Sequence, residues 1–433
     1  MKYTSINKVL TDKISGEWGV EPEDDCGVKI IRTANFTNLG VIDFSKIVFR
    51  KIESKKIEQK KLISGDVIVE KSGGSPTQPV GRVVYFENPD NSIYLCNNFT
   101  TVLRANKSIV FPKYLFYILF YNHLTRKTLR FQNKTTGIIN LKLENYLKSE
   151  IPLPPLDDQI RIATVLTRAE KLIAKRKESI KALDELLKST FLEMFGDPVR
   201  NEKGWEEKVI SDVCDEIVDC VNKTAPQSAI VTPYIMIRTS NIRNGKISLD
   251  VVKYVDEATY AIWTRRSVPR SGDILFTREA PMGEVGLLNS NEKVFLGQRV
   301  MQYRCNNAKI KPIFLLYIMQ TGFFSKQIER LGKGSTVKHL TVPDCFKFII
   351  PVPPLTLQNQ FAAIVKKIES LKIKYNQSLT ELKNLYGSLS QRAFKGELDL
   401  SKVSLEKANQ VIELSDEGMA AATMTNELSA LKK

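Results

Sequence analysis

Two stretches of the chain keep apolar residues at alternating intervals of three and four, and both stretches predict long helices. The first set is Leu166, Ala169, Ile173, Arg176, Ile180, Leu183, Leu187, Thr190 and Met194, and the second is Val365, Ile368, Lys372, Tyr375, Leu379, Leu382, Tyr386, Leu389 and Ala393. A mean period of 3.5 residues, kept over about four heptads, is typical of a coiled-coil seam. We expect the helices to pair through Leu166, Ile173, Ile180, Leu183 and Leu187 of the first set and Val365, Ile368, Leu379, Leu382 and Leu389 of the second.

Charged residues and glycines define the limits of these helices. The residues between the apolar positions, Lys171, Lys175, Lys177, Glu178, Lys181, Asp184 and Glu185, predict a solvated face. Gly196-Asp197-Pro198 is expected to end the first helix, and Gly396 follows the second. No proline interrupts either helix, and each apolar face needs a partner. The two helices therefore most simply pack on each other.

Short β-type runs precede each helix. They cover residues 67–69 and 83–86 in the first half of the chain, and 274–276 and 285–288 in the second, with Gly- and Pro-containing loops between them. A helix is predicted over 114–126 and another over 313–320, each followed by a polar loop. These patterns predict an α+β fold with a β-rich core.

The second half of the chain repeats the first about 200 residues later. Matched segments are Ile31-Arg32-Thr33-Ala34-Asn35 with Ile237-Arg238-Thr239-Ser240-Asn241, Ser64-Gly65-Asp66 with Ser271-Gly272-Asp273, Val80-Gly81 with Val285-Gly286, and Ile151-Pro152-Leu153-Pro154-Pro155-Leu156 with Ile350-Pro351-Val352-Pro353-Pro354-Leu355. We therefore predict a first globular domain at 1–155, a central helix at 156–197, a second globular domain at 198–354, a distal helix at 355–398 and a tail at 399–433.

The repeat has a geometric consequence. If a pseudo-two-fold axis relates the two globular domains, the two long coiled-coil helices that join them run antiparallel. Duplex DNA has its own two-fold symmetry, and dimeric proteins use this symmetry to read two half-sites at a fixed spacing. A single chain with two unequal domains would read two different half-sites.

The charge of the chain favours a polyanionic partner. The 433 residues include 64 Lys+Arg and 48 Asp+Glu, a formal net charge of +16, and such an excess attracts nucleic acid. No apolar stretch is long enough to span a membrane, and the N-terminus lacks the apolar core of a secretory signal. We expect a soluble, cytoplasmic protein without a membrane partner. The six cysteines and two histidines lack the spacing of a zinc site, so we predict no metal.

Basic and polar loop residues are the candidates for contacts with double-stranded DNA. Lys71, Gly73, Gly74, Arg278, Gly283 and Lys333 could meet phosphates, Lys134, Thr135, Thr136, Ser335, Thr336 and Lys338 could enter a groove, and Arg32 and Arg238 recur at matched positions. Arg299 could read a guanine, because a guanidinium fits O6 and N7 together. The alternatives are a solvated hairpin around the glycines, a surface ion pair for Arg299, and internal bracing by Arg32 and Arg238.

The repeated Ile-Pro-[Leu/Val]-Pro-Pro-Leu motif, followed by Gln159 or Gln358 and a long helix, resembles the specificity subunits of type I restriction-modification systems. Further resemblance lies in Gly272-Asp273-Ile274-Leu275, Gly297-Gln298-Arg299-Val300 and Ser335-Thr336-Val337-Lys338-His339-Leu340. The resemblance implies that each globular domain is a target-recognition domain that binds one half of a split DNA sequence. It also implies that the helices set the spacer and dock two methyltransferase (modification) subunits, which motor-nuclease restriction subunits can join.

The same resemblance implies that this chain has no catalytic residues and no cofactor of its own. S-adenosylmethionine, ATP and Mg²⁺ are then expected in the partner subunits, which methylate adenine and cut DNA. The alternatives are a self-contained nuclease or methyltransferase and a coiled-coil scaffold that binds only proteins. Asp66, Glu70 and Lys71 could hold Mg²⁺ in a nuclease, but the second repeat has Thr277 and Arg278 at the places of Glu70 and Lys71. No Asn/Asp-Pro-Pro-aromatic motif of an adenine methyltransferase is present.

Overall fold

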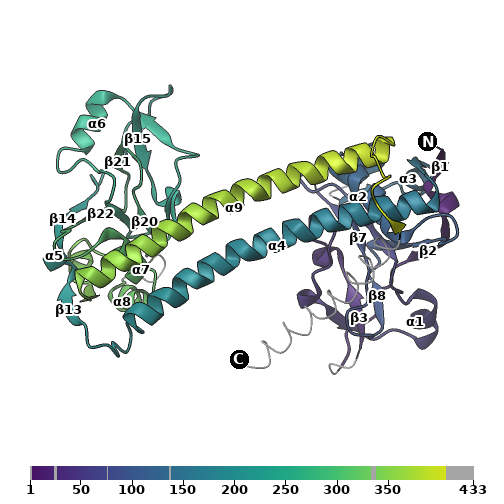
Figure 1. Ribbon diagram of the computed structural model, residues 1–433, viewed down its shortest axis with the longest axis horizontal. Helices are drawn as coiled ribbons and strands as arrows, with labels where there is room; N and C mark the ends of the chain where they lie inside the picture. The colour runs from purple at the N-terminus through teal and green to yellow at the C-terminus, as the bar shows by residue number, and fades with distance from the viewer. Residues whose placement is uncertain (1, 24–26, 76, 136–137, 333–337, 406–433) are drawn as a thin grey trace. The chain divides into compact units, whose positions relative to one another are not determined.

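The computed structural model describes residues 2–23, 27–75, 77–135, 138–332 and 338–405. The chain forms two compact units, the first from Met1–Lys177 and Ser378–Lys433 and the second from Glu178–Gln377. The long helices α4 (Leu156–Phe195) and α9 (Leu355–Lys395) each contribute one half to either unit (Figure 1). The predicted boundaries follow the helix ends, whereas the compact units divide within the helices, because each globular part packs on the nearest half of both.

The first unit is built on an antiparallel sheet in the order β2 (Leu10–Ser15), β9 (Thr100–Ala105), β5 (Val67–Glu70) and β7 (Val83–Tyr85). Alternate residues of a strand point to opposite faces of its sheet. Val67, Val69 and Leu103 accordingly enter the core beneath helix α2 (Pro112–Leu124). Ile68, Val84 and Val102 enter a second core against the sheet of β4 (Val48–Arg50), β3 (Val28–Ile31) and β8 (Tyr94–Cys96).

The second unit repeats this architecture. Its main sheet runs β14 (Cys214–Asp219), β22 (Val300–Cys305), β19 (Ile274–Thr277), β20 (Val285–Leu287), β17 (Gly245–Ile247) and β16 (Ile242–Arg243). The second sheet runs β18 (Lys253–Val255), β15 (Tyr234–Ile237) and β21 (Lys293–Leu296). In both units, the strand that precedes the candidate arginine pairs in parallel with a neighbouring strand. Strand β3, before Arg32, pairs with β8, and strand β15, before Arg238, pairs with β21. The predicted α+β class is confirmed.

Shorter elements complete the two units. The first unit adds the pair β1 (Tyr3–Ser5) and β12 (Glu150–Pro152), the sheet of β10 (Gln132–Thr135), β11 (Ile138–Leu141) and β6 (Ser72–Gly74), and helices α1 (Ser54–Lys60) and α3 (Leu143–Leu147). The second adds the pair β13 (Glu206–Val209) and β23 (Ile349–Val352) and helices α5 (Ile210–Val213), α6 (Glu257–Trp263), α7 (Pro312–Ile318) and α8 (Gly322–Leu331). The prediction of a polar loop after the 313–320 helix is wrong in this unit. Helix α8 stands there, and it forms because Phe324 and Ile328 lie one turn apart and are buried in the core.

The repeat match of Val80-Gly81 with Val285-Gly286 is also wrong by three residues. The amide of Gly81 donates to the carbonyl of Glu70, and the amide of Gly283 donates to the carbonyl of Thr277, at the same place in each sheet. Both glycines have a positive φ, +98° and +92°, which L side chains rarely adopt. Gly81 therefore corresponds to Gly283.

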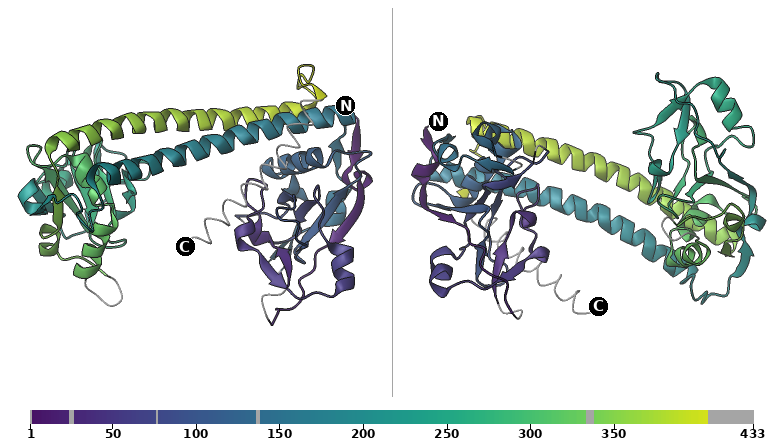
Figure 2. Two further views of the ribbon diagram at one scale, coloured as in Figure 1. Left: turned by 60° about the horizontal axis from the view of Figure 1, so that its bottom comes forward. Right: turned by 180° about the vertical axis from the view of Figure 1, so that it is seen from behind.

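Helices α4 and α9 pack together and run antiparallel. The Tyr386 hydroxyl donates to the Glu170 carboxylate at 3.0 Å in the first unit, and Lys372 Nζ lies 2.6 Å from Asp184 Oδ1 in the second. The two helices are side by side in every view (Figures 1 and 2). The predicted coiled coil is confirmed. Asp184 is exposed, as predicted for the solvated face, and it also binds Lys372 of the partner helix.

The predicted helix-pairing positions are all at least half-buried. Leu166, Leu187, Val365 and Ile368 are buried, and Ile173, Ile180, Leu183, Leu379, Leu382 and Leu389 are half-buried. After the helices, Gly196 and Gly396 both have φ near +77°, the conformation that commonly ends a helix. Among the described residues, no helix has both the length and the apolar character needed to cross a membrane.

The repeated Pro-Pro-Leu-x-x-Gln motif has a structural explanation. The buried side chain of Gln159 accepts a hydrogen bond from the amide of Phe111 at 2.8 Å and donates to the carbonyl of Pro154 at 2.8 Å. Gln358 does the same with the amide of Lys311 and the carbonyl of Pro353. Phe111 and Lys311 precede α2 and α7, so each glutamine joins the start of a globular-domain helix to the start of a long helix.

Candidate nucleic-acid interface

Most candidate residues of the first unit lie where strands of neighbouring sheets end. Arg32 follows β3 and Lys71 follows β5, and Gly73 and Gly74 lie in β6. Strand β6 pairs with β11, and β11 pairs with β10, which contains Lys134 and Thr135. The amide of Leu141 also donates to the carbonyl of Lys71 at 2.8 Å. The structure therefore brings these residues together, and we name this group, Arg32, Lys71, Gly73, Gly74, Lys134 and Thr135, the first strand-end cluster.

A buried ion pair holds the first strand-end cluster in place. The Arg82 guanidinium binds both oxygens of the Glu70 carboxylate, at 2.9 and 2.7 Å. It also donates to the carbonyls of Thr33 and Phe36, each at 3.1 Å, in the turn that follows Arg32. Arg82 thus joins the end of β5 to the end of β3. Arg82 is not among the residues predicted from the sequence, and the signal that could have found it is its position directly after the turn glycine Gly81.

The second unit makes the same connection with different chemistry. The Thr239 hydroxyl donates to the carbonyl of Ala280 at 3.1 Å, which ties the turn after β15 to the loop after β19. The amide of Gly297 donates to the carbonyl of Ile237, because β15 and β21 end side by side. Arg238, Arg278, Gly283, Arg299 and Lys338 gather here, since the amide of Arg278 donates to the carbonyl of Arg299 and the amide of Leu340 to the carbonyl of Arg278. We name these five residues the second strand-end cluster.

Two residues of the second strand-end cluster do not fit the predicted phosphate contact. Arg278 is only 6% exposed, and its Nη1 donates to the carbonyl of Leu340 at 2.9 Å. The amide of Gly283 is already bound to the carbonyl of Thr277. Both act inside the domain in this structure, because the Arg278 side chain is buried against the carbonyl of Leu340 and the Gly283 amide already has a protein partner. Arg299 lies 2.9 Å from Glu279 in a half-exposed ion pair, the alternative that the sequence left open.

The repeated arginines Arg32 and Arg238 have matched backbone surroundings. The amide of each donates to the side chain of a buried asparagine three residues later, Asn35 at 2.8 Å and Asn241 at 3.0 Å. Arg32 Nη2 also donates to the carbonyl of Lys46 at 2.8 Å, which is the bracing role. The Nε atoms of both arginines lack a hydrogen-bond partner within the described part of the chain. Both Nε atoms are shielded from solvent, so they are not placed to meet a ligand in this structure.

The remaining candidates differ in what the structure tells about them. Lys71 is half-buried and donates to the Ser15 hydroxyl at 2.7 Å, and burial lowers the pKa of its amine. Gly73 and Lys338 are exposed. Thr136, Lys333, Ser335 and Thr336 lie outside the described residues.

The acidic residues considered for a nuclease serve as arginine partners. The Asp66 carboxylate is bound by Arg104 through two hydrogen bonds of 2.9 Å, and the Glu70 carboxylate is bound by Arg82. Asp273 and Arg304 repeat the first pair in the second unit at 2.9 and 2.8 Å. Within the described ranges, no group of three or more His, Cys, Asp or Glu residues is placed so that it could hold a metal ion. Asp66 and Glu70 therefore have a structural role in this fold.

Comparison with known families gives a match to each half of the chain. Residues 15–182 and 202–384 each match the family described as "Type I restriction modification DNA specificity domain". Two curated relatives come from Methanocaldococcus jannaschii. The type I restriction enzyme MjaVIII specificity subunit is 27% identical over 62% of this chain and 66% of its own length. The putative type I restriction enzyme MjaX specificity subunit is 26% identical over 72% of this chain and 73% of its own length.

Solved structures share the fold. A chain from a study of complex assembly and conformational transition in a type I R-M system aligns with a TM-score of 0.55 at 20% identity, covering 92% of this chain and 98% of the other. The S subunit of a type I restriction-modification system from M. genitalium aligns with a TM-score of 0.54 at 15% identity, covering 91% and 96%. The two matched segments, the repeated α+β units and the paired helices agree, and the chain belongs to the family of type I restriction-modification DNA specificity subunits.

Proposed function

We propose that this chain recognises a bipartite sequence in double-stranded DNA, with each strand-end cluster reading one half-site. The observation that supports this most strongly is the duplication itself. The same fold occurs twice, with matched arginines at Arg32 and Arg238, but the loops around them carry different side chains. Similar frames with different contact residues are what two unlike half-sites require. The net charge of +16 supplies the attraction to phosphates.

We further propose that the paired helices set the spacing of the half-sites and dock two modification subunits. Heptad positions a and d form the seam, and the g position precedes each a residue. Four leucines occupy g positions: Leu172 and Leu186 on α4, and Leu371 and Leu385 on α9. They are 52%, 49%, 41% and 48% exposed. Exposed apolar residues flanking a coiled-coil seam, where charges are usual, favour a protein partner.

These leucines occur as one pair in each unit. The Glu170–Tyr386 contact places Leu172 beside Leu385 in the first unit, and the Asp184–Lys372 contact places Leu186 beside Leu371 in the second. The e positions on the other flank of the seam, Glu170, Asp184 and Glu369, face the globular parts. The two leucine pairs lie on the flank of the seam opposite the e positions. Two similar apolar pairs suit the docking of two copies of one partner.

The chemistry would belong to the partners. Modification subunits would bind S-adenosylmethionine and methylate adenine, and restriction subunits would use ATP and Mg²⁺ to move along and cut DNA. This chain would position them on the DNA without catalysing a step. Arg82, with its carboxylate and carbonyl partners in the first unit, would keep the strand ends in a fixed arrangement for base contacts.

Selection of bound DNA tests the proposal. The purified chain, alone and with its modification subunits, is incubated with a random duplex library, and the bound fraction is sequenced. The expected result is two short conserved blocks separated by an unspecified spacer of constant length. Arg238→Ala should weaken the contacts of one block, or of the whole site evenly, and leave the other block readable. A single conserved block, or binding without sequence preference, would refute the bipartite assignment.

A further inference from the structure

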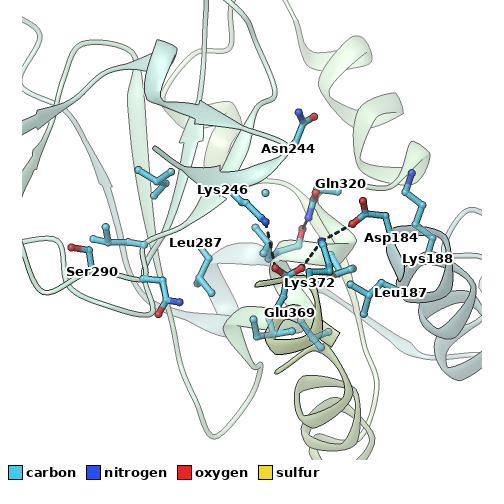
Figure 3. Close-up of a pocket in the computed structure, with 18 of the residues that line it drawn as sticks. Asp184, Leu187, Lys188, Asn244, Lys246, Leu287, Ser290, Gln320, Glu369 and Lys372 are labelled. Carbon is cyan, nitrogen blue, oxygen red and sulfur yellow. Dashed lines mark hydrogen bonds and ion pairs between the residues drawn. The ribbon is translucent and has the colours of Figure 1, made fainter. Parts of the chain in front are cut away.

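A chain of ion pairs connects both long helices with the globular part of the second unit. Lys372 Nζ lies 2.6 Å from Asp184 of α4 and 2.7 Å from Glu369 on its own helix, and Glu369 lies 3.4 Å from Lys246 of β17. Figure 3 shows these four side chains converging along a cavity of about 720 Å³ within this unit. Lys372 occupies a seam position and is only 8% exposed.

The ionised state of Lys372 is favoured in this place. Burial lowers the pKa of the amine, but the hydrogen bonds and charges of Asp184 and Glu369 outweigh the burial and raise the pKa above its ordinary value. The long aliphatic stem lies in the seam while the ammonium reaches the flank where the carboxylates stand. A buried charge in a coiled-coil seam stabilises little by itself, yet it can decide which helices pair.

The matched positions of the first unit lack this arrangement. Ile173 stands at the place of Lys372, and Lys383 stands at the place of Asp184. Glu170 stands at the place of Glu369, but its carboxylate accepts hydrogen bonds from Tyr117 at 2.6 Å and Tyr386 at 3.0 Å. The Lys372–Asp184 pair therefore makes the two ends of the helix pair different.

This difference discriminates between possible helix partners. The two helices share one seam pattern, so α9 could pair with α9 of a second chain in the same antiparallel register. Lys372 would then face Lys383 of the second chain, and two such contacts would occur in each dimer. If α4 paired with α4 of a second chain, Asp184 would face Ile173. Only α4 with α9 matches Lys372 with Asp184, whereas the like charges of Lys372 and Lys383 disfavour the pairing of α9 with α9.

We propose that Lys372 and Asp184 are the pairing determinants that direct α4 to α9 and oppose dimers made through identical helices. The inference stands on the repeat and the ion pairs. Its consequence for DNA rests on the proposed function: a paired dimer of like helices would present two equal recognition domains, whereas the single chain presents two different ones.

A double substitution tests the inference. Asp184→Lys with Lys372→Ile gives the second unit the residues that the first unit already has at these positions, so the helices remain compatible with folding. Light scattering after size-exclusion chromatography is expected to find the wild-type chain monomeric and the double variant partly dimeric. The dimer association constant should rise about tenfold or more, because the opposing lysine contacts disappear. Mixing two differently labelled samples of the variant should give energy transfer between chains.

The controls separate pairing from folding. Circular dichroism and thermal unfolding report whether the double variant is folded. If it is not folded, the dimerisation test uses Lys372→Ile alone, since this change only removes the charge from the seam. Lys246→Ala removes the outermost ion pair and should leave the chain monomeric. A wild-type dimer, or folded variants that stay monomeric without exchange at the same concentration, would overturn the inference. DNA is absent from these measurements, so they remain valid if the bipartite binding assignment fails.

Discussion

The exposed leucine pairs allow a quantitative prediction about partner docking. In the first unit we replace Leu172 and Leu385 by serine, the residue that the chain already carries at the g positions Ser179 and Ser378. Full burial of a leucine side chain stabilises a complex by about 1.5–3 kcal/mol. Because these two side chains are 52% and 48% exposed, docking can bury about half of each, and the pair contributes about 1.5–3 kcal/mol.

This free energy corresponds to a change of about 10- to 150-fold in the dissociation constant at one docking site. The second pair, Leu186 and Leu371, is untouched, so the other site should keep its affinity. Titration calorimetry with purified modification subunit is expected to give two equal sites for the wild-type chain. For the Leu172→Ser/Leu385→Ser variant it should give one strong and one weak site.

A third exposed leucine supplies the control. Leu192 is 50% exposed on α4, but it lies at an f position, where the second repeat has Gln391. Leu192→Gln should therefore leave both sites unchanged. The reasoning is refuted if the double serine variant binds two partner copies with wild-type affinity, or if Leu192→Gln weakens binding equally.

Three further predictions concern stability, pH and DNA. Arg304→Met leaves the buried Asp273 carboxylate without its guanidinium and should destabilise the second unit by about 3–5 kcal/mol in chemical denaturation; an unchanged midpoint would contradict the assigned role. Burial and the charge of Arg82 lower the pKa of His123 from 6.5 to about 4, so the unfolded chain binds more protons in that window and stability falls as pH drops from about 6.5 to 4. Hydrogen exchange of the first unit should find this loss reduced in His123→Gln and retained in His339→Gln. Arg238→Ala should lower the slope of log affinity against log salt by about 1 if the guanidinium meets a phosphate, and an equal slope would exclude that contact.

The fold was largely accessible from the sequence because its strongest signals are periodic. The seam residues from Leu166 to Met194 predicted α4, and the same spacing from Val365 predicted α9. The short apolar runs at 67–69 and 274–276 predicted β5 and β19, since both strands are buried on two faces and contain few polar residues. Helix α8 was missed although Phe324, Ile328 and Leu331 have the i, i+4, i+7 spacing of an amphipathic helix, because the segment after 313–320 was interpreted as a polar loop.

The candidate interface was accessible only in part. The repeat pointed to Arg32 and Arg238, and the parallel strands bring their neighbours together. It could not tell that Arg278 turns inward to the carbonyl of Leu340, because burial of a side chain depends on which loop covers it. Arg82 and Glu70 were equally hidden, since a pair twelve positions apart has no periodic signature.

The two buried glutamines make each joint between domain and helix depend on one amide group. Gln159 fixes the first turn of α2 and the proline turn before α4 at once, and Gln358 does so for α7 and α9. A rotation of either long helix about its own axis would therefore be transmitted directly to the helix beneath the sheet. A single Gln→Leu change would keep an apolar side chain of similar size at the joint but would remove the hydrogen bonds that join the domain helix to the long helix.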